Sequence, residues 1–320
     1  MNWASQFWQT LTSKSAVASI LEPVQPRVLL IIHNPTVPWE HGRKLTDVLG
    51  WHDPIDLVGQ FLYDIEAASF GYGRYQIAET IITDQFPQKA DGFHYDAESY
   101  LFRWRTKTGF HHPDLVDYPK LIQQFNIINR INTQDIDEVW LVAFPYAGYY
   151  ESLMVGPDAF WCNAPPLLIP EANRRFVIMG FNYERGPGEM LESFGHRAES
   201  ILNHLYRRKR GDANLWLRFT RHEKSHPGQA ECGTIHYAPN SETDYDWGNP
   251  RPVLSRAHTW LNFPDLTGEP KEVTCAEWGG GDIRQHHLWW LGHLPHAAGK
   301  SGGISHNWWQ YILNPNLIPQ

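Results

Sequence analysis

Short apolar runs alternate with amphipathic segments from about residue 27 to residue 208, and this alternation restricts the possible fold more than any other feature of the chain. Three runs are typical of strands buried in a sheet, and a fourth is rich in β-branched residues: RVLLIIHNP, DEVWLVAFPYAG and RRFVIMGFNYE, then YQIAETIIT. Helical spacing occurs in DPIDLVGQFLYDIEAASFG, with Asp53 as a candidate N-cap, Pro54 at the first helical position and Gly71 just past the end. It occurs again in YPKLIQQFNIINRI and in GPGEMLESFGHRAESILNH. The alternation predicts an α/β fold with a mainly parallel, doubly wound sheet.

The composition and the pattern of predicted elements change at about residue 211. From there the strand-like pieces are short, Gly and Pro are frequent, and Trp and His cluster in RQHHLWWLGHLPH and HNWWQY. We therefore expect an N-terminal extension at 1–24, an α/β core at 25–210 and a more irregular His/Trp-rich region at 211–320 that packs on the core. The lack of an obvious linker favours one continuous body.

Composition and charge exclude several classes of protein. Hydrophobic residues make up 42% of the 320 residues, which is ample for a core, and the net charge of −8 leaves no basic footprint for nucleic acid. The positive run Arg207 to Arg210 lies at a predicted helix end, where cations complement the helix dipole. No apolar run approaches the about 20 residues of a membrane span. Three widely spaced cysteines and an N-terminus too weak for a secretory signal favour the cytoplasm.

The helix expected after RRFVIMGFNYE carries an unusual polar face. At about 100° per residue, Glu189, Glu192, His196, Glu199 and Asn203 gather opposite the apolar side. A solvated face is the ordinary interpretation of such a pattern. Three features favour a site instead: the helix follows a buried strand and a Gly-Pro-Gly turn, it contains a glycine in its interior, and its polar stripe has no lysine. We therefore predict that Glu192, His196 and Glu199 act in catalysis or bind a metal ion.

Two further clusters contain metal-ligand chemistry. The segment CGTIHYAPNSETDYDWGNP holds His236, Asn240, Asp244, Asp246 and Asn249; its oxygens suit calcium and its imidazole suits zinc or a general base. Equally, these Asn and Asp side chains are typical caps of their own backbone turns.

The third cluster, HHLWWLGHLPH, supplies further imidazoles. His286 and His293 would share one face if the segment is helical, and His293 is a candidate metal ligand with His196 and His236. Packing among the tryptophans is the simpler role for each of these histidines.

Ends of strands supply the remaining candidates. In α/β sheets, ligands bind beyond the carboxyl ends of the strands. We therefore expect His33, Asn34 and Glu151 to contact substrate, with Arg185 as a clamp for a carboxylate or phosphate. Asn240 and Trp289 are further candidates for substrate binding, the latter as a stacking surface. No GxSxG, P-loop, GxGxxG or HExxH motif occurs in a suitable place.

Three motifs in one order resemble a group of bacterial proteins without an assigned activity. They are GHRAES, then CGTIHYAPN with DYDWGNP, then NWWQYI, and the resemblance covers about residues 27 to 315. It implies no mechanism. Proteins similar to this group are often secreted, which the N-terminus of this chain does not suggest.

Three functions remain compatible with the sequence. The first is a metal-dependent hydrolase whose divalent ion, zinc or alternatively calcium, is held by some of Glu192, His196, Glu199 and His236. The second is a metal-free glycoside hydrolase in which Glu151 and Glu192 flank a sugar stacked on tryptophans. The third is a carbohydrate- or peptide-binding protein without catalysis. The expected ligand is a small molecule, a glycan or a peptide, and the sequence does not indicate the oligomeric state.

Overall fold

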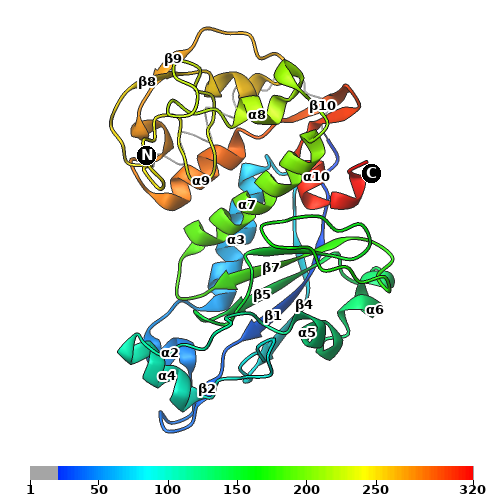
Figure 1. The fold of residues 1–320 in the computed structure, drawn as a ribbon, viewed down its shortest axis with the longest axis vertical. Coiled ribbons are helices and arrows are strands. Elements are labelled where there is room, and N and C mark those ends of the chain that lie inside the picture. Colours follow the sequence, from blue (N-terminus) through cyan, green and yellow to red (C-terminus); the bar gives the residue numbers. More distant parts are fainter. Residues whose placement is uncertain (1–20, 320) are drawn as a thin grey trace.

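The computed structural model describes residues 21–319, and a five-stranded sheet lies at its centre (Figure 1). The strands follow the order β4 (Gln76–Thr83), β1 (Arg27–His33), β5 (Glu138–Ala143), β7 (Phe176–Asn182) and β6 (Ser152–Val155). The first four run parallel, whereas β6 pairs antiparallel with β7. The chain thus has the predicted α/β fold with a mostly parallel sheet, to which the unpredicted β6 adds an antiparallel edge.

Helices pack on both faces of this sheet. Val28 and Leu30 of β1 belong to the same hydrophobic cluster as α3 (Pro54–Ala68) and α7 (Pro187–Tyr206). The intervening residues Leu29 and Ile31 point the other way, into a cluster with α5 (Tyr118–Gln124) and α6 (Ile127–Asn132). The alternation explains why the strands are apolar at nearly every position. Shorter elements complete this part of the chain: β2 (Thr36–Val37), β3 (Arg43–Lys44), α2 (Leu45–Leu49) and α4 (Ala97–Thr106).

Capping residues in the sequence correctly predicted where α3 begins, but the sequence did not predict the break between α5 and α6. Asp53 caps α3, accepting hydrogen bonds from Ile55 N and Asp56 N, with Pro54 in the first turn as predicted. The single helix expected over YPKLIQQFNIINRI is wrong, because the chain forms α5 and α6 with Asn126 between them at φ 51°. Asparagine tolerates this left-handed conformation, which ends one helix and redirects the next.

Most of the chain after α7 is built from short elements that lie on the side of α7 away from the sheet (Figure 1). The last residues return to the sheet, where Asn316 Nδ2 donates to Arg175 O just before β7. Phe219 packs against Trp260, Trp290 and Trp308, with ring centroids 5.0, 5.7 and 5.8 Å away. The elements are η1 (Gly211–Ala213), α8 (Leu215–Phe219), β8 (Val253–Ser255), η2 (Ala257–Asn262), β9 (Lys271–Val273), η3 (Cys275–Trp278), α9 (Ile283–Gly292), β10 (His296–Ser301), β11 (Ile304–Asn307), α10 (Trp309–Leu313) and η4 (Pro315–Leu317).

This C-terminal region contacts the sheet-bearing part closely. Arg284 of α9 forms a bidentate ion pair with the buried Asp64 of α3, with both nitrogen to oxygen distances 2.8 Å. A methyl group on Gly188 of α7 would lie 2.6 Å from Ile283 Cγ2, so only glycine lets α9 approach the start of α7 this closely. Residues on both sides of the predicted boundary at 210 belong to one hydrophobic cluster. The C-terminal region therefore packs directly on α7.

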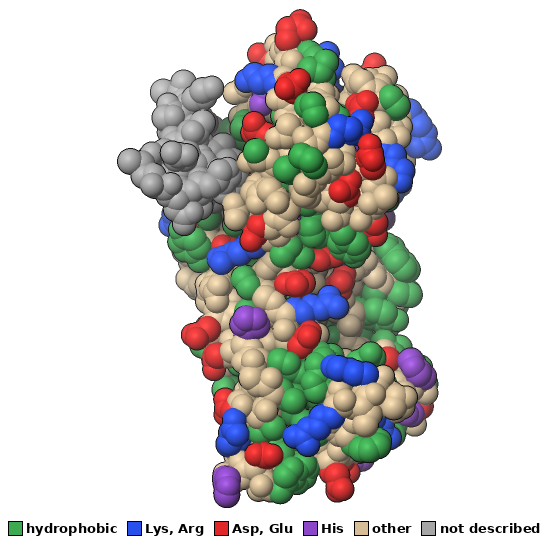
Figure 2. Space-filling model, turned by 90° about the vertical axis from the view of Figure 1, so that its left-hand side faces the viewer, with side chains coloured by type: hydrophobic (Ala, Val, Ile, Leu, Met, Phe, Trp, Pro, Cys, Tyr) green, Lys and Arg blue, Asp and Glu red, His purple; other side chains and the backbone are tan. Residues whose placement is uncertain are grey.

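The expected N-terminal extension is described only at its end. Residues 1–20 lie outside the described residues, whereas Val24 forms a β-bridge with Gly73. No described helix combines the length and apolar character needed to cross a membrane. On the face drawn in Figure 2, Lys and Arg side chains are scattered among Asp and Glu side chains.

Candidate functional site

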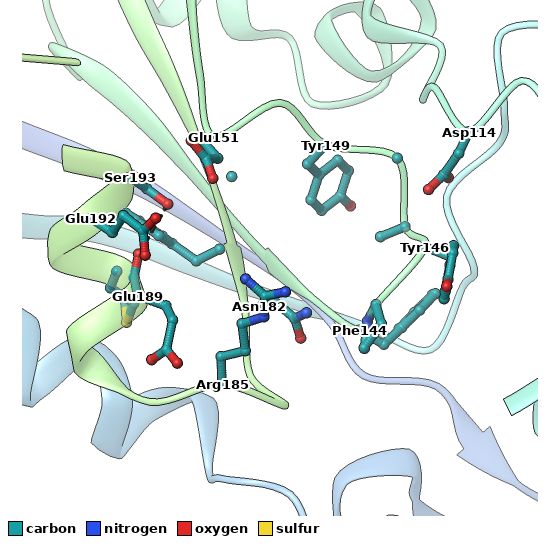
Figure 3. A pocket seen from close by; sticks show the side chains of 16 residues that line it. Asp114, Phe144, Tyr146, Tyr149, Glu151, Asn182, Arg185, Glu189, Glu192 and Ser193 are labelled. Carbon is teal, nitrogen blue, oxygen red and sulfur yellow. Dashed lines mark hydrogen bonds between the residues drawn. The ribbon is translucent and has the colours of Figure 1, made fainter. Parts of the chain in front are cut away.

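A polar pocket of about 250 Å³ lies beyond the carboxyl ends of β5 and β7. Figure 3 shows the carboxylates of Glu151 and Glu192 toward one end, Asp114 and Tyr146 toward the other, and Arg185 between the two ends. The pocket thus lies where ligands bind in open α/β sheets.

The loop that follows β5 forms one wall of this pocket and is fixed from behind. The fully buried ammonium of Lys89 donates hydrogen bonds to Tyr146 O at 2.6 Å and to Asp114 Oδ1 at 2.5 Å. Tyr146 adopts φ 64°, and its ring stacks on Phe110 with centroids 3.6 Å apart. A non-glycine residue in the left-handed region needs such support from its surroundings.

The second wall is α7, whose polar stripe meets a loop from the C-terminal region. Glu192, His196 and His236 offer one ligand atom each, and these atoms lie within 4.8 Å of one another. Glu192 Oε1 is 2.9 Å from His236 Nε2 and 3.9 Å from His196 Nε2. Two imidazole nitrogens therefore face the same carboxylate oxygen, and the group could hold a metal ion. We call Glu192, His196 and His236 the His/Glu group.

Each histidine of the His/Glu group is held at its other nitrogen by a carboxylate. His196 Nδ1 lies 3.1 Å from Glu199 Oε2, and His236 Nδ1 lies 3.1 Å from Asp244 Oδ1. Glu199 is itself fixed, because its Oε1 accepts a hydrogen bond from Ile235 N. A carboxylate on Nδ1 fixes the ring and keeps a proton on that nitrogen, so Nε2 is the atom that can bind a metal ion once it gives up the proton that faces Glu192 in the ion-free protein.

Glu151 connects the His/Glu group with the pocket. Its Oε2 lies 3.9 Å from His196 Nε2 and accepts a hydrogen bond from Asn163 Nδ2. Glu151 directly precedes β6, and its backbone O accepts a hydrogen bond from Gly180 N of β7. The antiparallel strand absent from the sequence prediction is therefore what brings this carboxylate to the site.

Contacts of Glu192, His196 and His236 with one another and with their neighbours set the protonation state of each side chain. Burial alone would raise the pKa of Glu192, but the imidazoles of His236 and His287 outweigh it and lower the pKa, so the carboxylate stays ionised. Burial alone would lower the pKa of His196 and of His236. The bonds to Glu199 and Glu192, respectively, outweigh burial and raise both pKa values. In the absence of an ion, the carboxylates thus favour protonated imidazoles.

A pair of buried histidines lies behind Glu192. His287 Nε2 is 3.9 Å from Glu192 Oε2 and has no hydrogen-bond partner among the described residues. Its Nδ1 lies 3.0 Å from His286 Nδ1. Burial lowers the pKa of both imidazoles, which are therefore neutral.

Several predicted site residues have structural contacts instead of facing the pocket. His33 bonds Tyr149 OH at 2.8 Å, and Asn34 donates to Thr46 Oγ1 at 3.0 Å; both are buried. Neither lines the pocket. Burial lowers the pKa of His33 to about 4.

Three candidates from the C-terminal region have similar structural contacts. Asn240 Nδ2 donates to the carbonyls of Asn249 and Arg251, which fixes its own loop. Trp289 is buried, with its ring 4.2 Å from that of His293. His293 caps the end of α9 and bonds Trp289 O through Nδ1, so the structure leaves it out of the His/Glu group.

The loop around Asp244 contains residues that sequence reasoning missed. The ring of Tyr245 lies 4.4 Å from that of His236, and Tyr245 adopts φ 59°. Burial, with the nearby Glu192 carboxylate, raises the pKa of Tyr245 to about 12. Asn163, which holds Glu151, was also missed. No local pattern signals either residue, because both contacts form within irregular loops, where no helix or strand spacing relates the partners.

No model of a protein family matches the chain, and no match was found among curated proteins or among solved structures. The resemblance to a group of bacterial proteins therefore stays a prediction. Function has to be inferred from the chemistry of the site.

Proposed function

We propose that the protein is a metal-dependent hydrolase whose divalent ion is held by Glu192, His196 and His236. One observation carries the proposal: both imidazoles have Nδ1 on a carboxylate and direct Nε2 toward Glu192 Oε1. A solvated helix face has no reason to share one carboxylate oxygen between two oriented imidazoles. Two imidazoles and a carboxylate are also the protein ligands of a common class of catalytic zinc site.

Zinc suits this set of ligands better than calcium. Calcium takes six to eight oxygen ligands, whereas the group provides two nitrogens. The loop oxygens that suggested calcium are used locally: Asp246 Oδ2 accepts hydrogen bonds from Glu242 N and Asn249 Nδ2. This is the role of Asx side chains in turns.

Residues near the ion would have separate roles in hydrolysis. A bound zinc ion supplies a Lewis acid for the scissile group and lowers the pKa of water. Glu151 lines the pocket beside His196, and in this proposal it takes the proton from the attacking water. Arg185, the one cation among the lining residues, would hold an anionic group of the substrate.

The surroundings of Glu192 do not favour the metal-free glycoside hydrolase. Such an enzyme pairs a general acid with a second carboxylate that is free to act as nucleophile or base. Glu192 instead contacts the imidazoles of His236 and His287, and Trp289, the expected stacking surface, is buried. We also propose a cytoplasmic location, which the three free cysteines support.

The test is zinc binding and zinc-dependent turnover. Protein stripped with a chelator and reloaded should hold one zinc ion per chain by mass spectrometry of the metal content. His196→Ala and His236→Ala should each weaken binding by more than the roughly 10–100-fold that loss of an outer partner causes. His94→Ala, which removes an exposed imidazole outside the site, is the matched control.

Hydrolysis is then followed with fluorogenic esters, amides and glycosides. Zinc should restore activity to the stripped protein but not to the His196→Ala variant. Equal zinc binding by His196→Ala and the unaltered protein would rule out the proposed ligands. Stoichiometric zinc without zinc-dependent turnover of any of these bonds would rule out the hydrolase.

A further inference from the structure

A second hollow, of about 420 Å³, lies along the other half of the polar stripe of α7. Its lining includes Trp161, Glu199, Asn203 and Thr234. Glu199 belongs to both places, because it lines this hollow and holds His196 through Nδ1. From Glu192 to Asn203 the stripe extends about 16 Å at 1.5 Å per residue. The His/Glu group therefore lies between two hollows on one helix face.

Trp161 is the feature of this hollow that packing does not explain. Its side chain is 59% exposed, although tryptophan has the largest apolar surface of any residue, and its ring contacts no other described aromatic ring. Its position is nevertheless fixed. Two residues later, Asn163 N donates to Ser200 Oγ of α7 and Asn163 Nδ2 donates to Glu151. One short loop thus holds both the exposed ring and the carboxylate at the His/Glu group.

Apart from the buried Trp216, the remaining lining is polar and carries little net charge. Arg207 offsets Glu199, and burial with the nearby Arg207 charge lowers the pKa of His204 to about 4, which leaves that imidazole neutral. Thr220, Thr234 and the exposed Asn203 add hydroxyl and amide groups. The Asn203 amide has no hydrogen-bond partner among the described residues, so it can both donate to and accept from a ligand.

We propose that this hollow binds a neutral saccharide chain, with one sugar ring stacked on Trp161 and its hydroxyls bonded to Asn203 and the threonines. A pyranose ring has an apolar C–H face and a rim of hydroxyl groups, which matches an exposed aromatic face surrounded by uncharged donors and acceptors. A chain bound there would extend along α7 toward the His/Glu group. That the bound chain is also the substrate rests on the proposed hydrolase function; that it binds does not.

Binding is tested by isothermal titration with soluble hexasaccharides of glucose, of xylose and of N-acetylglucosamine. At least one should bind to both the metal-stripped and the zinc-loaded protein. Trp161→Ala should weaken binding by about tenfold through loss of the stacking surface. Asn203→Ala should also weaken it, whereas Trp39→Ala should not, because Trp39 is a comparably exposed tryptophan (52%) in a different hollow.

The outcomes separate this inference from the proposed function. Binding to metal-stripped protein that depends on Trp161 supports the saccharide site even if zinc never binds to the His/Glu group. Zinc-dependent hydrolysis of simple esters, with no hexasaccharide bound at millimolar concentration, overturns the saccharide site and leaves the hydrolase standing. Equal affinities for Trp161→Ala and the unaltered protein also overturn it.

Discussion

At the scale of single residues, the contact between His236 and Asp244 gives the sharpest test of the His/Glu group. Asp244 lies 3.1 Å from His236 Nδ1 and has no direct contact with the ligand atoms that face Glu192. If His236 binds zinc through Nε2, Asp244→Ala removes the group that orients the ring. We expect zinc affinity to fall by about tenfold, the lower end of the range for such partners, because Asp244 is half exposed. Competition with a chelating dye measures the change.

The matched control for this prediction is Glu242→Ala in the same loop. Glu242 pairs with Arg251 at 3.1 Å and is 61% exposed, so its removal deletes the same charge without touching His236. Zinc affinity should stay within about twofold of the unaltered protein, since exposed charges are screened. Equal losses in the two variants would mean that Asp244 acts only through its charge, and the orienting role would be wrong.

Residue contacts within α7 were predictable from the sequence, and those across loops were not. The spacings of three and four residues predicted that His196 lies near Glu199 and Glu192, as it does. His236 and Asp244 were noted only as possible ligands in a turn-rich segment, because their approach to Glu192 depends on how the chain after α8 folds back. Helical spacing is local physics, whereas the meeting of residues 192 and 236 is decided by tertiary packing.

At the scale of elements, the interior glycine of α7 sets how closely the loop of His236 can approach. A methyl group on Gly195 would lie 2.5 Å from Ile235 Cγ1 and closer still to its Cδ1. Ile235 N holds Glu199, so displacing Ile235 disturbs the support of His196 as well. We expect Gly195→Ala to destabilise the protein by about 1–3 kcal/mol from overpacking, despite a helix-propensity gain of about 1 kcal/mol. Denaturant unfolding gives the difference.

Gly59 of α3 provides the opposite case. It is exposed, and a methyl group there would meet nothing within 4 Å. Gly59→Ala should therefore stabilise the protein by about 0.5–1 kcal/mol, because only the propensity term changes. Two Gly→Ala changes in helix interiors are thus expected to have opposite signs. A stabilised Gly195→Ala variant would show that α7 and the loop can separate without loss of folding.

The elements themselves were predicted best where one local rule decides. Asp53 and Pro54 fix the start of α3, and the apolar runs mark β1, β5 and β7. The break between α5 and α6 depends on Asn126 taking a left-handed conformation, which its side chain permits but does not require. β6 has no distinctive pattern, because it is only four residues long and its antiparallel partner β7 lies about 25 residues later in the chain. Pairing across such distances is set by the whole sheet.

At the scale of the whole molecule, buried neutral histidines make stability depend on pH. Burial lowers the pKa of His33 and His293 to about 4 and also lowers the pKa values of His286, His287 and His296. An unfolded chain protonates these imidazoles near pH 6.5, so it binds more protons than the folded chain below that pH. The free energy of unfolding should therefore fall as the pH drops from about 6.5 toward 4. The raised pKa values of His196 and His236 oppose this trend in metal-free protein, but they involve fewer groups.

His33 allows this prediction to be tested on one group. With a folded pKa of about 4, its burial accounts for about 2 kcal/mol of the stability lost between pH 7 and pH 5. His33→Asn keeps a polar side chain opposite Tyr149 but cannot titrate. Between pH 7 and pH 5 the variant protein should therefore lose about 2 kcal/mol less stability than the unaltered protein. Exposed His94, which has no hydrogen bond to any described residue, gives the control His94→Asn, which makes the same change of side chain away from any buried site. Chelator-treated protein unfolded in urea at each pH provides the measurement, with a constant m value showing that the unfolded state is unchanged. If His33→Asn and the unaltered protein lose equal stability between pH 7 and pH 5, His33 is protonated in the folded protein, and the environment at the end of β1 is more polar than its burial implies.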